Sequence, residues 1–454
     1  MRLKHFIGKS VRGYIDVDID FRESVTFLIG INGSGKTTVL KLLSALLEPS
    51  YRMLCSIDFL ELTLLCEIDE KKTIQLFCRK EKRQMLLRYE DISAKIQAEE
   101  TFNVSDMSQD FEEHSDLARE EFIRNKSAFE SGNVVGMIKT IQTPLFLGIN
   151  RRVIEMSFGE GMVRDASTVR DIQLRRRRRL IDDAVDKALY DIQNMVFDYV
   201  RHNARRQAVY ADNFRKKVVH DSFKFYDNFA PLLSNDYNKQ LELLEKKHED
   251  IKLAIKELGL DDLTTEVDNL FDHLEVLIKD LSQLSPQKDL NPDYYNTLGK
   301  WIVNSTQLEK IDAITQYGNE YLDNLNKLRE PINRLQDGVN IFFKEGGKEL
   351  IVDGQGEIKV KIISKKKINS IYELSSGEKQ LVIMLAHLAL NRGNRLHSIF
   401  FIDEPELSLH ISWQELFVDA LLSASPQTQF IIATHAPAIL AKPERKEWCE
   451  DLSR

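Results

Sequence analysis

The sequence predicts an α/β fold in which a mixed sheet with a glycine-rich loop and an antiparallel β layer are interrupted by a helical insertion. First, a short apolar strand at 25–29 (VTFLI) is followed by a glycine-rich turn and a helix with apolar spacing at 37–47. Second, a long, charged, glycine-poor segment with helical spacing occupies about 165–340. Third, a further strand-and-helix segment contains the apolar strands 398–402 and 430–433.

The first lobe of the sheet domain is expected over residues 1–152. Residues 14–21 (YIDVDIDF) alternate apolar and acidic side chains, and three strand-like runs between 60 and 89 are separated by charged turns. This pattern is typical of an antiparallel layer. Residues 93–135 are polar with weak periodicity, so we expect short helices or a mobile loop there. A strand at 143–149 (TPLFLGI) closes the lobe.

The helical insertion is expected over residues 153–340. Apolar residues recur every three or four positions in two runs between 241 and 284, interrupted by a glycine and a pair of aspartates. This predicts an antiparallel hairpin that forms a short coiled coil. After Pro331 the chain returns to strand-like sequence, and residues 341–454 are expected to form the second lobe.

Composition excludes several classes of protein. The chain has 454 residues and 43% hydrophobic content, which is enough for a globular protein with a large core. Its 63 Lys and Arg against 71 Asp and Glu provide no global attraction to nucleic acid or anionic lipid. Four widely spaced cysteines form neither a disulfide framework nor a CxxC pair, and no apolar run is long enough to serve as a signal or membrane span. We therefore expect a soluble, cytoplasmic protein without a membrane partner.

The strongest motif is GINGSGKT at 30–37, which fits the phosphate-loop pattern GxxxxGK[ST] between a buried strand and a helix N-terminus. Glycines let the backbone amides wrap a polyphosphate, the lysine reaches the terminal phosphates, and the threonine hydroxyl ligates magnesium. The predicted binding residues are Gly30, Asn32, Gly33, Ser34, Gly35, Lys36, Thr37 and Thr38.

A second predicted anion site lies far downstream, where LSSGEKQ at 374–380 precedes an apolar helix. Its small residues and backbone amides stand at a helix N-terminus. The residues concerned are Ser375, Ser376, Gly377 and Glu378.

Two strand ends carry further polar residues. The strand at 398–402 ends in Asp403 and Glu404, which places two carboxylates at the edge where α/β sheets usually bind ligands. The sequence PELSLH follows, and the strand at 430–433 ends in a threonine and His435.

The order of these motifs resembles the ATP-binding-cassette (ABC) superfamily. LSSGEKQ with DEPELSLH and ATHAP is similar to the branch that contains RecF, SMC proteins and OLD nucleases, and the resemblance covers about residues 1–150 and 340–440. It implies ATP and Mg²⁺ as cofactors. It also implies that the signature of one head completes the γ-phosphate pocket of another, so that two copies dimerise around ATP. The implied site residues are Lys36 and Thr37 of Walker A, Ser375 and Gly377 of the signature, Asp403 and Glu404 of Walker B, and the switch residue His435.

The resemblance also implies roles for single residues. Asp403 organises magnesium, Glu404 is the general base that polarises the attacking water, and His435 senses the γ-phosphate. Two features depart from the family pattern: Ser376 replaces the first glycine of LSGGQ, and the glutamine that would reach magnesium has no clear counterpart. Gln142 is a candidate for that metal contact, and an ordinary polar residue before a strand is the alternative interpretation.

A dense basic run begins at Arg175 and ends at Arg179 (RRRRR), with further basic residues downstream between 201 and 217. Three interpretations stay open: a solvated helix face balanced by nearby acids, a nucleic-acid groove and a protein-docking face. His248 occupies an apolar heptad position, where a packed or half-exposed histidine is expected.

The compact head and short helical arm resemble ATPase subunits of two-component anti-phage systems. Septu, whose ATPase PtuA acts with an HNH nuclease (PtuB), is the first expectation, and PARIS, whose ATPase AriA acts with a TOPRIM partner, is the second. OLD nucleases carry their nuclease domain after the switch histidine, but this sequence runs only to Arg454, so any nuclease is expected to be a separate protein. The alternative is a RecF- or SMC-like DNA-repair clamp ATPase that binds DNA directly. Long-armed or zinc-hook ATPases are disfavoured, because the heptad runs are short and CxxC is absent.

Overall fold

The computed structural model describes residues 1–69, 72–105, 116–141, 145–147, 153–154, 184–222, 237–257, 262, 264–283, 292–390, 399–407 and 409–453. The chain forms two compact units, one comprising Met1–Phe197 and Ile332–Arg454 and the other Asp198–Pro331. Gln142 and the arginines from Arg175 to Arg179 lie outside the described residues. None of the described helices combines the length and the apolar character that a membrane crossing requires.

The first unit contains a six-stranded sheet in the order β15-β3-β14-β13-β8-β9. All neighbouring strands are parallel except β8 and β9. Strands β13 and β14 are wholly buried, which explains their continuous apolar sequences. The strands are β3 (Val25–Ile29), β8 (Leu145–Leu147), β9 (Val153–Ile154), β13 (Ile399–Asp403), β14 (Gln429–Ala433) and β15 (Cys449–Asp451). Helices α1 (Lys36–Leu47), α10 (Ser376–Leu390) and α11 (Ile411–Ala424) also belong to this unit, and α1 packs against β13 and β14.

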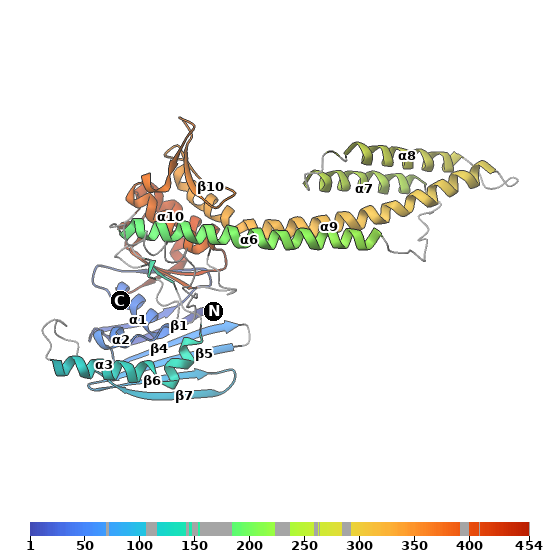
Figure 1. The fold of residues 1–454 in the computed structure, drawn as a ribbon. Helices are drawn as coiled ribbons and strands as arrows, with labels where there is room; N and C mark the ends of the chain where they lie inside the picture. Colours follow the sequence, from blue (N-terminus) through green and yellow to red (C-terminus); the bar gives the residue numbers. More distant parts are fainter. Residues whose placement is uncertain are drawn as a thin grey trace. The chain divides into compact units, whose positions relative to one another are not determined.

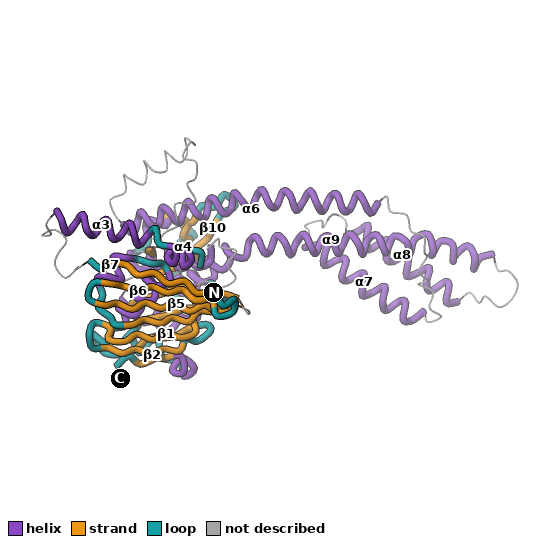
Figure 2. The backbone as a smooth tube through the Cα atoms, turned by 90° about the horizontal axis from the view of Figure 1, so that it is seen from below, coloured by secondary structure: helices purple, strands orange, loops and turns teal. Residues whose placement is uncertain are grey.

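Beside it lies an antiparallel sheet in the order β2-β1-β4-β5-β6-β7, whose strands run side by side in Figure 2. Its buried side chains form one core with α1 and with α2 (Tyr51–Ser56), which explains the alternating sequence of β2. The strands are β1 (Arg2–Val11), β2 (Ile15–Asp20), β4 (Glu61–Asp69), β5 (Lys72–Glu81), β6 (Gln84–Asp91) and β7 (Ile96–Asn103).

Strand β7 corrects the expectation of helices or a mobile loop throughout 93–135. It pairs with β6 over its whole length, and α3 (Asp116–Glu130) and α4 (Asn133–Lys139) follow it and pack near this edge (Figure 2). The strand carries mostly polar, exposed side chains because it is the last strand of the sheet. An edge strand of this kind lacks the apolar alternation on which sequence patterns depend.

A small sheet of β10 (Lys348–Val352), β11 (Ile358–Ile362) and β12 (Lys367–Ser370) leads into α10. Asn340 joins it to the preceding helix, because its side chain donates to the Leu350 carbonyl (3.1 Å) and accepts from the Leu350 amide (2.7 Å). The short helix η3 (Ile371–Glu373) begins with a capping box between Ser370 and Glu373. The loop that contains Ser375 therefore starts from a well-anchored segment.

The helices of the insertion are α6 (Ala184–Ser222), α7 (Tyr237–Glu257), α8 (Thr264–Gln283) and α9 (Pro292–Phe343), and α6 and α9 each extend into both units. Helices α7 and α8 lie side by side (Figure 1). The core of the second unit consists of Leu244, Ile251, Phe271, Leu274, Ile278, Leu281 and Trp301. His248 stacks on Phe271 with ring centroids 4.4 Å apart.

Helix α9 continues through Pro331 to Phe343, and the strands expected after this proline follow as β10 and β11. A proline inside a helix removes one backbone donor and costs about 3 kcal/mol. The following turns bury Leu335, Val339 and Phe342, and this apolar burial offsets that loss. In addition, the helical insertion was expected to begin at residue 153, but residues 153–154 form β9, which pairs with β8 in the core sheet.

Candidate nucleotide-binding site

The glycine-rich loop connects β3 to α1 and depends on glycine at three positions. Gly30, Gly33 and Gly35 have φ angles of 146°, 91° and 93°, which side chains other than glycine rarely adopt. A Cβ atom at Gly30 would lie 2.6 Å from the Ser34 hydroxyl oxygen. The backbone therefore makes a tight turn before the first amides of α1.

Lys36 and Ser34 place polar groups inside the loop where a polyphosphate would lie. The Lys36 ammonium is buried and donates to the carbonyls of Gly30 (2.7 Å) and Ile31 (3.2 Å) inside the loop. The Ser34 Oγ atom is buried and has no hydrogen-bond partner within the described part of the chain. A buried hydroxyl without a partner is unfavourable, and a phosphate oxygen would satisfy it. The loop therefore fits a phosphate chain.

Thr37 and Asp403 meet although 366 positions separate them. The Thr37 hydroxyl donates to Asp403 Oδ1 at 3.0 Å, which joins the start of α1 to the end of β13. Burial raises the pKa of Asp403 to about 6, and the nearby Glu404 carboxylate adds to this rise, while the Thr37 hydroxyl and Lys41 oppose it. A divalent cation would compensate the buried charge, so this oxygen pair fits Mg²⁺.

Glu404 lies on a sharp turn directly after β13. Its φ angle is 48°, and its amide donates to the Ala433 carbonyl of β14 at 2.9 Å. A left-handed conformation in a residue with a side chain is strained and is often found at functional sites. Asp403 pairs in register with Ala433, so Glu404 and His435 emerge at the same sheet edge, with Glu404 Oε1 4.0 Å from His435 Nδ1.

The signature residues surround the N-terminus of α10. Ser375 and Ser376 are exposed, whereas Glu378 is buried and accepts from the Ser375 amide and hydroxyl, both at 2.9 Å. Glu378 also pairs with Lys348 of β10 at 2.8 Å. Burial tends to raise the pKa of Glu378, but Lys348 and Ser375 outweigh this effect and hold it below its usual range. Glu378 therefore holds the loop in shape and leaves the serines accessible.

One contact of the phosphate loop comes from a residue that the sequence did not point to. Strand β15 pairs with β3, and the Ile31 amide donates to Ser453 Oγ at 3.2 Å. The Leu452 amide donates to the Ile29 carbonyl at 2.9 Å. Ser453 follows a three-residue strand and lies 422 positions from Ile31 in the sequence. No local sequence pattern therefore points to this contact.

Replacing Ser453 by alanine is expected to weaken ATP binding by about 2- to 5-fold, because a partly exposed hydrogen bond contributes about 0.5–1 kcal/mol. Nucleotide-binding calorimetry on the folded variant measures this. A loss of 100-fold or an unchanged affinity would each contradict a modest stabilising role for the Ser453–Ile31 contact.

The arrangement has the parts that phosphoryl transfer to water requires. A backbone loop and Lys36 can hold a polyphosphate, Thr37 and Asp403 can hold magnesium, and Glu404 can orient water beside them. Of the predicted site residues, the structure brings Lys36, Thr37, Asp403, Glu404 and His435 together at the carboxyl end of the core sheet. The roles of these side chains stay predictions, as does that of Gln142.

Comparison with solved structures finds SMC heads. The Smc head domain with an extended coiled coil bound to the C-terminal domain of ScpA, from Pyrococcus furiosus, aligns over 97% of this chain and 91% of that chain, with 14% identity and a TM-score of 0.33. The SMC head domain from Thermotoga maritima aligns over 97% and 92%, with 12% identity and a TM-score of 0.32.

Comparison with curated proteins finds two ATPases with retron names. The Retron Vc95 probable ATPase of Vibrio cholerae serotype O1 biovar El Tor is 29% identical over 164 residues, which covers 28% of this chain and 32% of that protein. The Retron Ec83 probable ATPase of Escherichia coli is 34% identical over 88 residues, which covers 17% of this chain and 16% of that protein. The chain thus spans about a third or less of the length of these relatives.

The first unit combines a phosphate loop on a mainly parallel sheet with an antiparallel layer, and a helical insertion interrupts it in the sequence. A family model described as an AAA ATPase domain (AAA_15) matches residues 1–440. Since this match extends over nearly the whole sequence, the chain belongs to the AAA ATPase domain family.

Proposed function

We propose that the chain binds and hydrolyses ATP between two copies of its head, and that this cycle controls a separate nuclease in a bacterial anti-phage complex. The observation that carries the ATPase part is the convergence of Thr37, Asp403, Glu404 and His435 at one sheet edge. The start of α1 and the ends of β13 and β14 supply these side chains beside a loop that fits phosphates.

Hydrolysis transfers the γ-phosphoryl group of ATP to water, with ADP as the leaving group. Magnesium, when bound, supplies positive charge to the phosphate oxygens. Lys36 exchanges its bonds to the loop carbonyls for bonds to phosphate oxygens, since its ammonium already lies inside the loop. Glu404 orients the attacking water and accepts its proton, which Asp403 is less suited to do because it is hydrogen-bonded to Thr37.

Dimerisation follows from the position of the signature. Ser375 and Ser376 are exposed residues at the N-terminus of α10, where backbone amides favour an anion. Their own carboxylate neighbour, Glu378, is neutralised by Lys348 and turned into the loop. Ser376 and the N-terminus of α10 are therefore accessible to the γ-phosphate of a nucleotide bound by a second head.

The purified chain is expected to hydrolyse ATP and to leave DNA and RNA intact, because every hydrolytic residue named above serves a nucleotide phosphate. The measurement is incubation of labelled DNA and RNA with the chain and Mg²⁺ or Mn²⁺. The Glu404→Gln variant, run alongside, excludes a contaminating nuclease. Robust cutting by the isolated wild-type chain would overturn the two-component proposal.

For the partner, an HNH nuclease of the Septu type (PtuB-like) is our first proposal and a TOPRIM partner of the PARIS type is the second. Both rest on the resemblance of the motif order and short helical arm to those ATPases. The names of the two relatives, retron probable ATPases, support the ATPase half of the proposal. Co-purification of the chain with the product of the neighbouring gene is the direct test, and a lone, stably monomeric ATPase would count against it.

A RecF- or SMC-like clamp that binds DNA directly is the second candidate, and exposed arginines on α6 favour it. Arg201, Arg205 and Arg215 are exposed on this helix, within the second unit. Binding to phosphates through such residues weakens steeply as salt concentration rises. Tight DNA binding by the chain alone, with a steep salt dependence, would favour the clamp over the effector-controlling ATPase.

A further inference from the structure

The carboxylate of Glu406 is the hub of a hydrogen-bond cluster that the proposed mechanism does not use. Its side chain is 7% exposed. Oε2 accepts from the Thr434 hydroxyl at 2.9 Å, and Oε1 accepts from the His435 amide at 2.9 Å. The His435 Nδ1 atom lies 2.9 Å from the same Oε1 atom. Two hydrogen bonds and one close nitrogen–oxygen contact from two successive residues thus converge on one carboxylate.

The cluster links the ends of two adjacent strands. Glu406 lies in the short helix η4 (Pro405–Leu407) after β13, while Thr434 and His435 follow β14. The strained turn at Glu404 lies beside β14, because the Glu404 amide donates to the Ala433 carbonyl at 2.9 Å. Thr434 extends the cluster, since its hydroxyl also accepts from the Ala436 amide at 3.1 Å. The turn that carries His435 is thereby tied to the strand that carries Glu404.

The chemistry of the pair determines how the imidazole is oriented. A carboxylate only accepts hydrogen bonds, so its position 2.9 Å from Nδ1 of His435 favours the form of the ring that carries a hydrogen on Nδ1. Nε2 is then the ring atom left to meet a ligand. The His435 side chain is 45% exposed, so this half of the ring is accessible while the other half is held. A ring held by a carboxylate in this way keeps one tautomer and one orientation.

We propose that Glu406 is a positioning residue for ATP hydrolysis, which holds His435 so that Nε2 faces the γ-phosphate and couples it to the strand end that bears Glu404. This rests on the proposed function. Glu406 touches neither the nucleotide nor the water, and it acts through His435. Without Glu406, the imidazole rotates freely and the turn after β14 loses its anchor. ATP binding itself depends on the phosphate loop and is unaffected.

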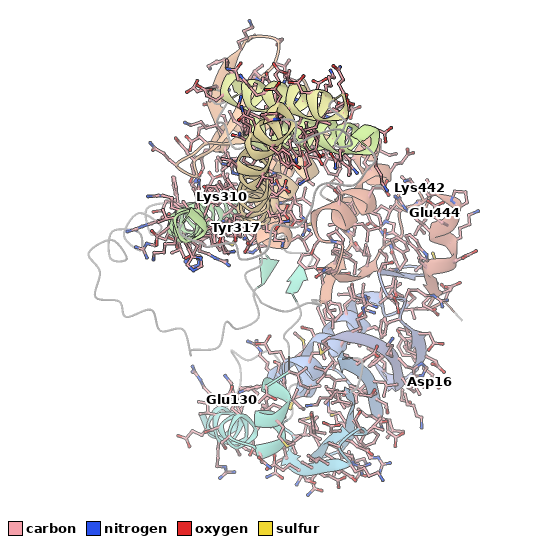
Figure 3. All side chains as sticks on the ribbon, turned by 90° about the vertical axis from the view of Figure 1, so that its right-hand side faces the viewer. Asp16, Glu130, Lys310, Tyr317, Lys442 and Glu444 are labelled. Atoms are coloured by element: carbon pink, nitrogen blue, oxygen red, sulfur yellow. The ribbon has the colours of Figure 1, made fainter. Side chains whose placement is uncertain are left out.

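The test is a double-mutant cycle with Glu406→Ala, His435→Ala and the double variant, in which kcat, KM and ATP affinity are measured. Each single change is expected to lower kcat by about 10- to 100-fold, and the double variant is expected to lose no more than His435→Ala alone. ATP affinity stays within about threefold of wild type in all three variants. Glu444→Ala is the matched control, because Glu444 is an exposed glutamate in the same unit (Figure 3), and its kcat stays at the wild-type value.

Glu406→Gln keeps the size of the side chain and serves if Glu406→Ala does not fold. It retains one acceptor oxygen and replaces the other with an amide NH₂ group, so a loss in kcat of about 10-fold is expected, again absent in the His435→Ala background.

Losses that multiply in the double variant, or a wild-type kcat for both Glu406 variants, overturn the inference. If Glu404→Gln also retains full turnover, the proposed ATPase site itself is wrong. If only Glu404→Gln is inactive, the ATPase proposal stands and the role of Glu406 falls.

Discussion

Glu404→Gln is expected to bind ATP with nearly wild-type affinity and to hydrolyse it about 10²- to 10⁴-fold more slowly, the usual contribution of a positioned general base. Glutamine preserves the shape of the side chain but cannot accept the proton of water. Glu404 stands on a turn whose amide is bonded to β14, so the substitution leaves the backbone in place. Single-turnover hydrolysis and nucleotide-binding calorimetry separate the two effects.

The Glu404→Gln variant should accumulate ATP-loaded dimers, because slow hydrolysis prolongs the ATP-bound state. Light scattering after size-exclusion chromatography, with and without Mg-ATP, measures this. Glu415→Gln provides a matched control, because Glu415 is an exposed glutamate on α11. Turnover near wild type in Glu404→Gln would show that another group positions the water.

Lys36→Ala is expected to lower ATP affinity by at least about 100-fold, because charge-assisted bonds to phosphate contribute more than neutral ones and a buried site strengthens them. The Lys36 ammonium bonds only to carbonyls of its own loop in the described contacts, so the fold should survive its loss. Mg-ATP should raise the Tm of the wild type and leave that of the variant unchanged.

Lys139→Ala is the control for this experiment, because Lys139 is exposed at the end of α4. It should keep both the affinity and the ligand-induced rise in Tm. If a well-folded Lys36→Ala protein binds ATP as tightly as the wild type, Lys36 has no part in nucleotide binding.

Several elements could be predicted from local sequence alone. The helix expected at 37–47 is α1 (Lys36–Leu47), and the apolar strands expected at 398–402 and 430–433 are β13 and β14. Each of these elements has either a regular helical spacing of apolar residues or a continuous apolar run. Strands β7, β12 and β15 were missed because they are short or polar and lie at or near sheet edges, where packing imposes little pattern on the side chains.

The phosphate loop can be predicted from local sequence, because a strand, a glycine turn and a helix start need only residues that are adjacent in the chain. The sequence also placed Asp403, Glu404 and His435 at strand ends. Which of these residues come into contact depends on the arrangement of the strands in the folded protein.

The contacts between Thr37 and Asp403, between Glu406 and His435, and between Ile31 and Ser453 all depend on the strand order β15-β3-β14-β13. A parallel sheet receives its neighbouring strands from distant parts of the chain, and their order follows from packing of the whole core. For this reason the residues of the nucleotide site could be predicted from the sequence, whereas the contact between Glu406 and His435 could be identified only from the folded structure.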